Sequence, residues 1–89
     1  MTKPPLEGMD RSRAIAIALQ EAHQETLRAA GQWAPFHSVH EGFGVLLEEV
    51  DELKWACWRK EPDPVELRKE AIHVAAMALR FAAELTLPL

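Results

Sequence analysis

The stretch Glu48-Glu49-Val50-Asp51-Glu52 places acidic residues at four of five positions, inside a segment that otherwise has the apolar periodicity of a helix. Another acidic residue, Glu70, lies on the next segment with the same periodicity. Like charges stacked on a helix repel one another. The run therefore either faces open water or is neutralised by a divalent cation.

The chain before this run predicts an arm and a first helix. Residues 1–9 contain Pro4, Pro5 and Gly8, a composition typical of a flexible or extended arm. Asp10 or Ser12 can cap a helix that follows. We expect that helix to end near Gly31, because glycine suits the left-handed conformation that terminates many helices.

Two more helices are predicted around and after the acidic run. Ser38 is a good cap for a helix over about 39–60, which contains the run. Asp63 can cap a third helix with Pro64 at its first position, a favoured arrangement. Pro88 should end that helix, and no segment alternates as a strand does.

Apolar residues form a broad stripe on every predicted helix. On the first helix the stripe consists of Ile15, Leu19, Ala22 and Leu27. On the second it consists of Phe43, Leu46, Leu47, Val50, Leu53 and Cys57, and on the third of Val65, Ala71, Ile72, Ala75, Leu79, Ala82 and Leu85. These stripes exceed what one thin hairpin can cover. We therefore predict an all-α, three-helix protomer that completes a bundle as a homodimer or a tetramer.

Length and composition narrow the class of protein. A chain of 89 residues makes one domain, which we place at residues 10–89. The net charge of −4 argues against a nucleic-acid polymer as partner, because such binders are usually basic. The single cysteine excludes an internal disulfide and suits a reducing cytoplasm. No apolar run approaches the length of a membrane span, and the N-terminus lacks the apolar core of a signal peptide.

The spacing of the carboxylates allows them to converge. Positions three and four apart share a helical face, so Glu48, Glu49 and Glu52 can approach one small volume. Glu70 and His73 repeat the three-residue spacing on the third helix. If the second and third helices form an antiparallel hairpin, these residues can surround one or two cations. Oxygen ligands in this number suit Mg²⁺, with Mn²⁺ as an alternative.

The alternative interpretation is a solvated acidic face. Asp51 is rotated away from the other carboxylates and should face solvent. Lys54 and Lys69 could balance the remaining charge without any metal. Spacing alone leaves both interpretations open.

The segment 41–53 resembles the first metal-binding helix of the MazG-type all-α nucleotide pyrophosphohydrolases. That family carries Glu-Glu-x-x-Glu on one helix and Glu-x-x-Asp on the next. Glu48, Glu49 and Glu52 match the first motif in full.

The second motif is matched in part. Glu70 occupies its first position, but His73 stands where the family has Asp. The continuation Val74-Ala75-Ala76-Met77-Ala78-Leu79-Arg80 is also similar to the family. The likeness covers residues 38–86, and the first helix more loosely.

The resemblance implies an activity and a site. It implies hydrolysis of a (deoxy)nucleoside triphosphate to the monophosphate and pyrophosphate, with Mg²⁺ held by Glu48, Glu49, Glu52 and Glu70. Water would attack the α-phosphorus, with Glu49 or Glu52 as the general base. Aromatic residues would line the pocket for the base, and the candidates are Trp33, Phe36, Trp55 and Trp58. Lys69 and Arg80 are the candidates for phosphate contacts.

Two features leave alternatives open. Trp55 and Trp58 can form one patch that serves either a dimer interface or base stacking. His73 either ligates a different metal, contacts phosphate directly, or marks a degenerate site. In the last case the chain would be a catalytically impaired nucleotide-binding or interaction protein that keeps the family fold.

Overall fold

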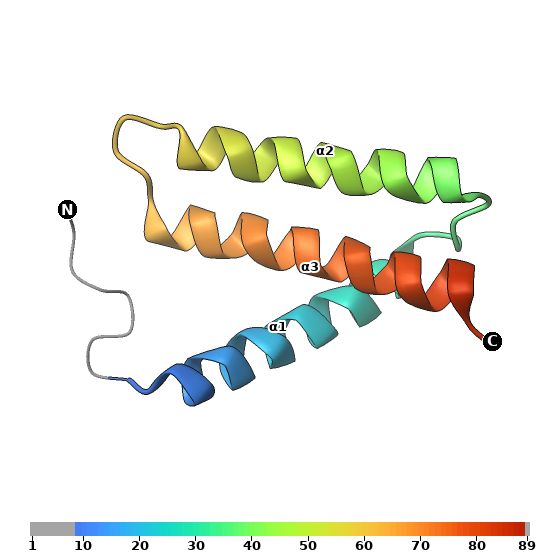
Figure 1. The fold of residues 1–89 in the computed structure, drawn as a ribbon, viewed down its shortest axis with the longest axis horizontal. Coiled ribbons are helices and arrows are strands. Elements are labelled where there is room, and N and C mark those ends of the chain that lie inside the picture. The colour runs from blue at the N-terminus through green and yellow to red at the C-terminus, as the bar shows by residue number, and fades with distance from the viewer. Residues whose placement is uncertain (1–8, 89) are drawn as a thin grey trace.

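Three helices make up the part of the chain that the computed structural model describes, residues 9–88, and that part contains no strand. They are α1 (Arg11–Gln32), α2 (Val39–Cys57) and α3 (Pro64–Thr86). Helices α2 and α3 run antiparallel, and α1 crosses α3 obliquely on the side away from α2 (Figure 1). Helices α1 and α2 each pack against α3 but not against each other. The predicted all-α fold of three helices is confirmed for the described residues, while the predicted arm lies almost entirely outside them.

The N-termini of the helices form where the sequence predicts them. Asp10, Ser38 and Asp63 each accept a hydrogen bond from a backbone N–H of the first turn that follows, at 2.8, 3.1 and 3.0 Å respectively. Each cap satisfies one of the free donors at the start of a helix, an effect typically worth about 1 kcal/mol.

Helix α1 ends at Gln32, close to the predicted end near Gly31, but not by the predicted left-handed cap. Gly31 lies inside α1 without a left-handed conformation, and the chain leaves the helix at Trp33 in an extended conformation (φ −118°). Helix α2 ends at Cys57, before the predicted end near residue 60. Leaving the helix here frees Arg59 to pair with Glu66 on α3, with 2.8 Å between Nε and Oε1.

The core is smaller than the predicted stripes. Its buried apolar residues are Ala22, Ala29, Phe36, Ala56, Ala76 and Met77. Several stripe residues are instead exposed in the protomer, namely Ile15, Leu19, Leu27, Phe43, Leu47, Val50, Cys57, Val65, Ala71, Leu79 and Ala82. The predicted faces were therefore wrong in part. A neighbouring helix covers only a narrow stripe, and small residues such as Ala56 and Ala76 are among the most buried positions.

Gly42 allows α2 to approach the C-terminal half of α3. A Cβ atom at this position would lie 2.8 Å from side-chain atoms of both Phe81 and Leu85, and 3.2 Å from Phe36. At Gly44 a Cβ atom would meet nothing within 4 Å. The two glycines of α2 thus have different roles, although both lower its helix propensity.

We expect Gly42→Ala and Gly44→Ala to change stability in opposite directions. Gly44→Ala should stabilise the protein by up to about 1 kcal/mol, because alanine favours the helix. Gly42→Ala should destabilise it by about 1–3 kcal/mol, because three packed side chains must move to admit the methyl group. Urea denaturation of both variants checks this, and equal effects at the two positions would contradict the close approach.

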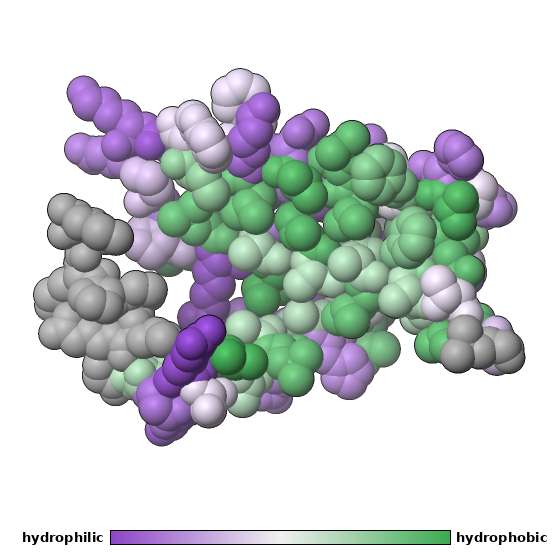
Figure 2. Space-filling model, viewed as in Figure 1, coloured by the Kyte–Doolittle hydropathy of each residue, from purple (hydrophilic) through white to green (hydrophobic). Residues whose placement is uncertain are grey.

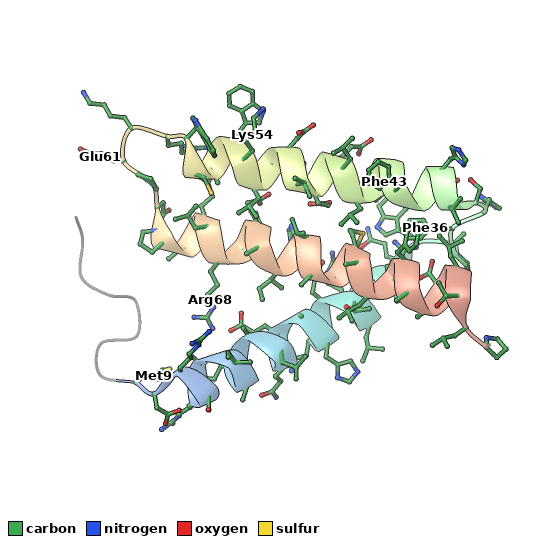
Figure 3. All side chains as sticks on the ribbon, in the orientation of Figure 1. Met9, Phe36, Phe43, Lys54, Glu61 and Arg68 are labelled. Carbon is green, nitrogen blue, oxygen red and sulfur yellow. The ribbon has the colours of Figure 1, made fainter. Side chains whose placement is uncertain are left out.

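A buried ion pair on α3 holds the segment between α1 and α2 in place. Arg80 is only 3% exposed and donates from Nε to Oε2 of Glu84 at 2.7 Å. Its Nη2 donates to the carbonyl oxygen of Ala34 at 3.1 Å, and its guanidinium lies 4.2 Å from the ring centroid of Phe36. Oε1 of Glu84 accepts from the backbone N–H of Phe36 at 2.9 Å. The connecting segment, with Phe36 labelled in Figure 3, is therefore held against α3.

Candidate metal centre

Four potential ligands from two helices meet between α2 and α3. Glu49 and Glu52 lie one turn apart on α2, and Glu70 and His73 lie one turn apart on α3. Each offers one ligand atom, and these four atoms all lie within 4.8 Å of one another. The antiparallel hairpin brings the two pairs opposite each other.

The donor set fits a divalent cation. One oxygen of Glu49 and one of Glu70, Oε2 in both, are buried without a hydrogen-bond partner among the described residues. Nδ1 of His73 lies 3.8 Å from Oε2 of Glu49, too far for a hydrogen bond. Buried oxygens without partners are costly, and a bound cation would satisfy them. Three carboxylates and one imidazole provide enough donors for such an ion.

The crowding of these carboxylates affects their protonation. Burial is the main cause that raises the pKa of Glu49, and the neighbouring charge of Glu52 adds to it. Burial also raises the pKa of Glu70, and the adjacent carboxylate of Glu52 adds to this shift. A positive charge on a protonated His73 would lower the pKa of both. Without a cation, ionising this cluster opposes folding.

We expect Glu49→Gln to stabilise the metal-free protein near neutral pH. A pKa raised by folding stabilises the protein at low pH, and that contribution is lost as the pH rises through the raised value. The glutamine keeps the shape of the side chain and removes the charge. The gain in melting temperature, measured in a chelating buffer, should therefore disappear at a pH low enough to protonate Glu49. A variant less stable than the wild type at pH 7 would contradict this expectation.

Glu48 lies outside the group of four, although the sequence predicts it as a ligand. It is exposed and lines a neighbouring pocket of about 490 Å³. Glu49 and His73 line the same pocket, which extends to Trp33 and Arg80. The pocket thus joins the four potential ligands to the segment between α1 and α2.

The other residues predicted to contact substrate lie on several sides of the cluster. Trp55 lines a hollow of about 260 Å³ together with Glu52 and Glu70. Lys69 lines a pocket of about 560 Å³ that also reaches His73. Trp58 lines none of these three pockets and is 76% exposed. The predicted set is thus dispersed, and Arg80, which was predicted to contact phosphate, is instead buried and pairs with Glu84.

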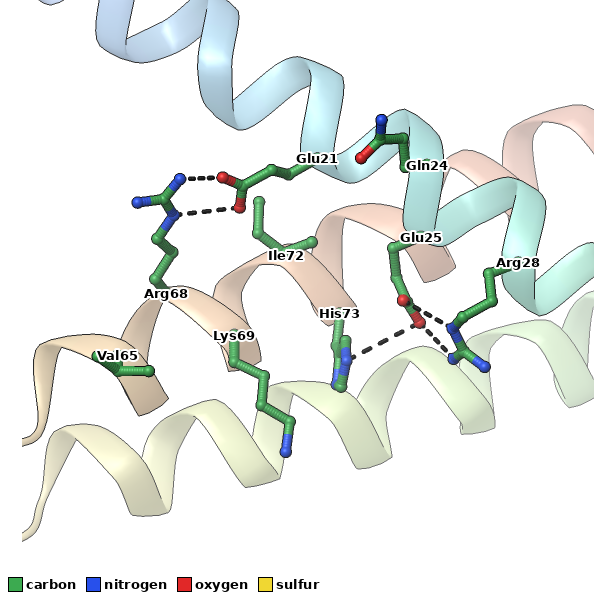
Figure 4. Close-up of a pocket in the computed structure, with 9 residues that line it drawn as sticks. All are labelled: Glu21, Gln24, Glu25, Arg28, Val65, Arg68, Lys69, Ile72 and His73. Carbon is green, nitrogen blue, oxygen red and sulfur yellow. Dashed lines mark hydrogen bonds and ion pairs between the residues drawn. The ribbon is translucent and has the colours of Figure 1, made fainter.

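Sequence reasoning missed Glu25, which lies beside His73. Oε2 of Glu25 is 3.8 Å from Nε2 of His73, and its carboxylate also pairs with Arg28 (Figure 4). The hydrogen bond from Arg28 lowers the pKa of Glu25 and keeps it ionised. The spacing of Glu25 and Arg28 is that of an ordinary surface pair on a helix, so the sequence carried no signal that α1 would reach the cluster.

None of the described helices has the combination of length and apolar composition that crossing a membrane requires. No protein-family profile matches the chain, and neither a curated protein nor a solved structure matches it.

Proposed function

We propose that this protein hydrolyses a (deoxy)nucleoside triphosphate to the monophosphate and pyrophosphate in the presence of a divalent cation. The observation that carries the proposal is the meeting of Glu49, Glu52, Glu70 and His73, with ligand atoms within 4.8 Å. The resemblance of the segment 41–53 to the MazG-type pyrophosphohydrolases supplies the reaction.

The residues around the cluster are suited to parts of this reaction. A bound divalent cation would neutralise phosphate charge and lower the pKa of water. Attack of water on the α-phosphorus forms one P–O bond and breaks the bond to pyrophosphate, so a base must take a proton. Glu49 or Glu52 would take that proton, the role that the resemblance implies for one of these glutamates. The pocket beside it, with Trp33 at its edge, would hold the nucleoside.

A panel of nucleoside triphosphates tests the proposal directly. Each nucleotide is incubated with the protein and Mg²⁺, Mn²⁺ or Co²⁺, and pyrophosphate and monophosphate are quantified. We expect both products in equal amounts from at least one nucleotide. Release of inorganic phosphate alone, or no product with any cation, would contradict the proposed reaction.

The working form we propose is a homodimer or a larger assembly. Large apolar side chains are exposed along α2, including Phe43 (58%), Leu47 and Val50. Apolar side chains gather over α2 and α3 on the face seen in Figure 2. An apolar surface of this kind commonly marks an interface, and the small core of the protomer favours stabilisation by a partner.

We expect light scattering to give at least twice the mass of the 10.0 kDa chain at micromolar concentration. Leu47→Lys should shift the protein toward the monomer, because it places a charge in the apolar face. Glu61→Lys introduces the same side chain in the loop after α2 and serves as the control. A monomeric wild-type protein would contradict the assembly.

A second candidate function is nucleotide binding without turnover. The observation that favours it is His73 in place of the Asp of the family motif, which removes one negative charge from the cluster. The variant His73→Asp separates the two. A gain of hydrolysis in an inactive wild type would indicate a binding protein whose site this one residue impairs.

A further inference from the structure

The two nitrogens of His73 face carboxylates on different helices. Nδ1 lies 3.8 Å from Oε2 of Glu49 in the cluster, and Nε2 lies 3.8 Å from Oε2 of Glu25 on α1. The side chain of His73 is 27% exposed and lies between the two. The imidazole therefore points one nitrogen into the cluster and the other away from it.

We propose that Glu25 is a positioning residue that fixes His73 as a nitrogen ligand, so that the centre selects a transition-metal ion over Mg²⁺. The inference rests on the metal site of the proposed function. It adds the class of cation that the site takes, and it assigns a role to a residue of α1.

The chemistry of a neutral imidazole supports this assignment. One ring nitrogen carries a proton and the other carries the lone pair that binds a metal. Histidines that ligate metals usually donate the remaining N–H to a carboxylate or a carbonyl oxygen. Glu25 is the carboxylate on the Nε2 side, so a proton on Nε2 leaves the lone pair of Nδ1 directed toward Glu49. Closing the 3.8 Å separation to a hydrogen bond requires a shift of about 1 Å.

Arg28 holds Glu25 in place for this role. Nε of Arg28 donates to Oε1 of Glu25 at 2.9 Å, and Nη2 donates to Oε2 at 2.5 Å. The fork of two hydrogen bonds orients the carboxylate and keeps it charged. Figure 4 shows Glu25 between Arg28 and His73, whereas Glu21, one turn earlier on α1, turns toward Arg68.

A nitrogen ligand changes which ion binds best. Mg²⁺ takes oxygen ligands and gains little from imidazole. Co²⁺, Zn²⁺ and Fe²⁺ bind imidazole well. Three carboxylates with one neutral imidazole also carry less negative charge than four carboxylates, which weakens the attraction for every divalent cation. The net effect favours the ions that bond to nitrogen.

Two measurements that do not depend on activity test the proposal. Calorimetry with Co²⁺ and with Mg²⁺ gives the ratio of their affinities. Pulsed electron paramagnetic resonance of bound Mn²⁺ detects coupling to a ¹⁴N nucleus if an imidazole is a ligand. We expect ¹⁴N coupling in the wild type, and a Co²⁺ preference over Mg²⁺ of about a hundredfold or more.

Matched variants separate the two histidine contacts. His73→Asp should abolish the ¹⁴N coupling and lower the Co²⁺-to-Mg²⁺ ratio at least about tenfold. Glu25→Gln should weaken Co²⁺ binding roughly ten- to a hundredfold and Mg²⁺ binding less. His40→Asp is the control for His73→Asp, because it makes the same change at an exposed position of α2. Glu21→Gln is the control for Glu25→Gln, because Glu21 also pairs with an arginine but lies away from His73. Both controls should behave as the wild type.

The outcomes distinguish this proposal from the function on which it rests. If Mn²⁺ bound to the wild type without ¹⁴N coupling and did not bind to Glu49→Gln, the role of His73 would be overturned. The carboxylate site would then still be supported. Equal effects of Glu25→Gln and Glu21→Gln would overturn the role of Glu25. Absence of binding by Co²⁺, Mn²⁺ and Mg²⁺ alike would overturn both the inference and the metal-dependent function.

Discussion

Glu52→Gln is expected to reduce nucleotide hydrolysis at least about a hundredfold. Mutating a residue that hydrogen-bonds to a metal ligand typically lowers activity about ten- to a hundredfold, and losing a ligand itself should cost more. Glu52 belongs to the group of four potential ligands and adjoins both Glu49 and Glu70, whose pKa values its charge raises. The amide keeps the volume of the side chain and cannot carry negative charge. Calorimetry should show a parallel loss of cation binding, and circular dichroism should show an unchanged helix content.

The neighbouring carboxylate provides the control for this prediction. Asp51 is exposed and lies outside the group of four, so Asp51→Asn makes the same change in charge without touching a ligand. We expect its activity to remain within about twofold of the wild type, as for an ordinary surface substitution. Hydrolysis that survives both Glu49→Gln and Glu52→Gln would place the reaction elsewhere on the protein.

Arg80→Leu is expected to destabilise the protein by about 3–5 kcal/mol, the usual cost of removing one partner of a buried ion pair. The substitution leaves the carboxylate of Glu84 without its main partner and removes the hydrogen bond to Ala34. It also removes the cation from the face of Phe36. Urea denaturation followed by circular dichroism measures the change.

A second arginine of α3 gives the matched comparison. Arg68 pairs with Glu21 through two nitrogens, but its side chain is 59% exposed. Arg68→Leu should therefore cost about 1 kcal/mol or less. The double variant Arg80→Leu/Glu84→Leu should recover part of the loss, because no buried charge is then left unpaired. If Arg68→Leu and Arg80→Leu lowered the free energy of unfolding equally, burial would not determine how much these ion pairs stabilise the protein.

The dependence on pH follows from the same pair. Arg80 holds the pKa of Glu84 below its usual range. A depressed pKa contributes stability that is present at neutral pH and is lost as the pH falls through the folded-state value. The difference between the wild type and Arg80→Leu should accordingly shrink in acid.

The helices could be predicted because local chemistry determines them. Asp10, Ser38 and Asp63 cap their helices through contacts within one turn, which a sequence displays directly. The buried faces could not be predicted as well. Which side of a helix is covered depends on where its neighbour lies. Helix α3 closely approaches α2 at Gly42, and Ala56 is also buried, whereas Phe43 and Leu47 remain exposed.

The candidate site was predictable to the extent that it lies on one hairpin. Glu49, Glu52, Glu70 and His73 share faces through i, i+3 spacing, and an antiparallel hairpin then brings them together. The contribution of α1 was not predictable. Glu25 reaches His73 only because α1 crosses α3 at this point, and such a crossing has no signature in the residues themselves.

Helix α1 packs on α3 and not on α2, so part of α1 should open at a lower free-energy cost than the hairpin of α2 and α3. The part of α1 up to Glu25 lies outside the core cluster that contains Ala29, so we expect its amide protons to exchange through a local opening that costs less than global unfolding. The four potential ligands all belong to α2 and α3, whereas Glu25 belongs to α1. Partial opening would therefore detach the carboxylate behind His73 while the four potential ligands remain assembled, and the ordering of α1 would become part of the affinity for the ion.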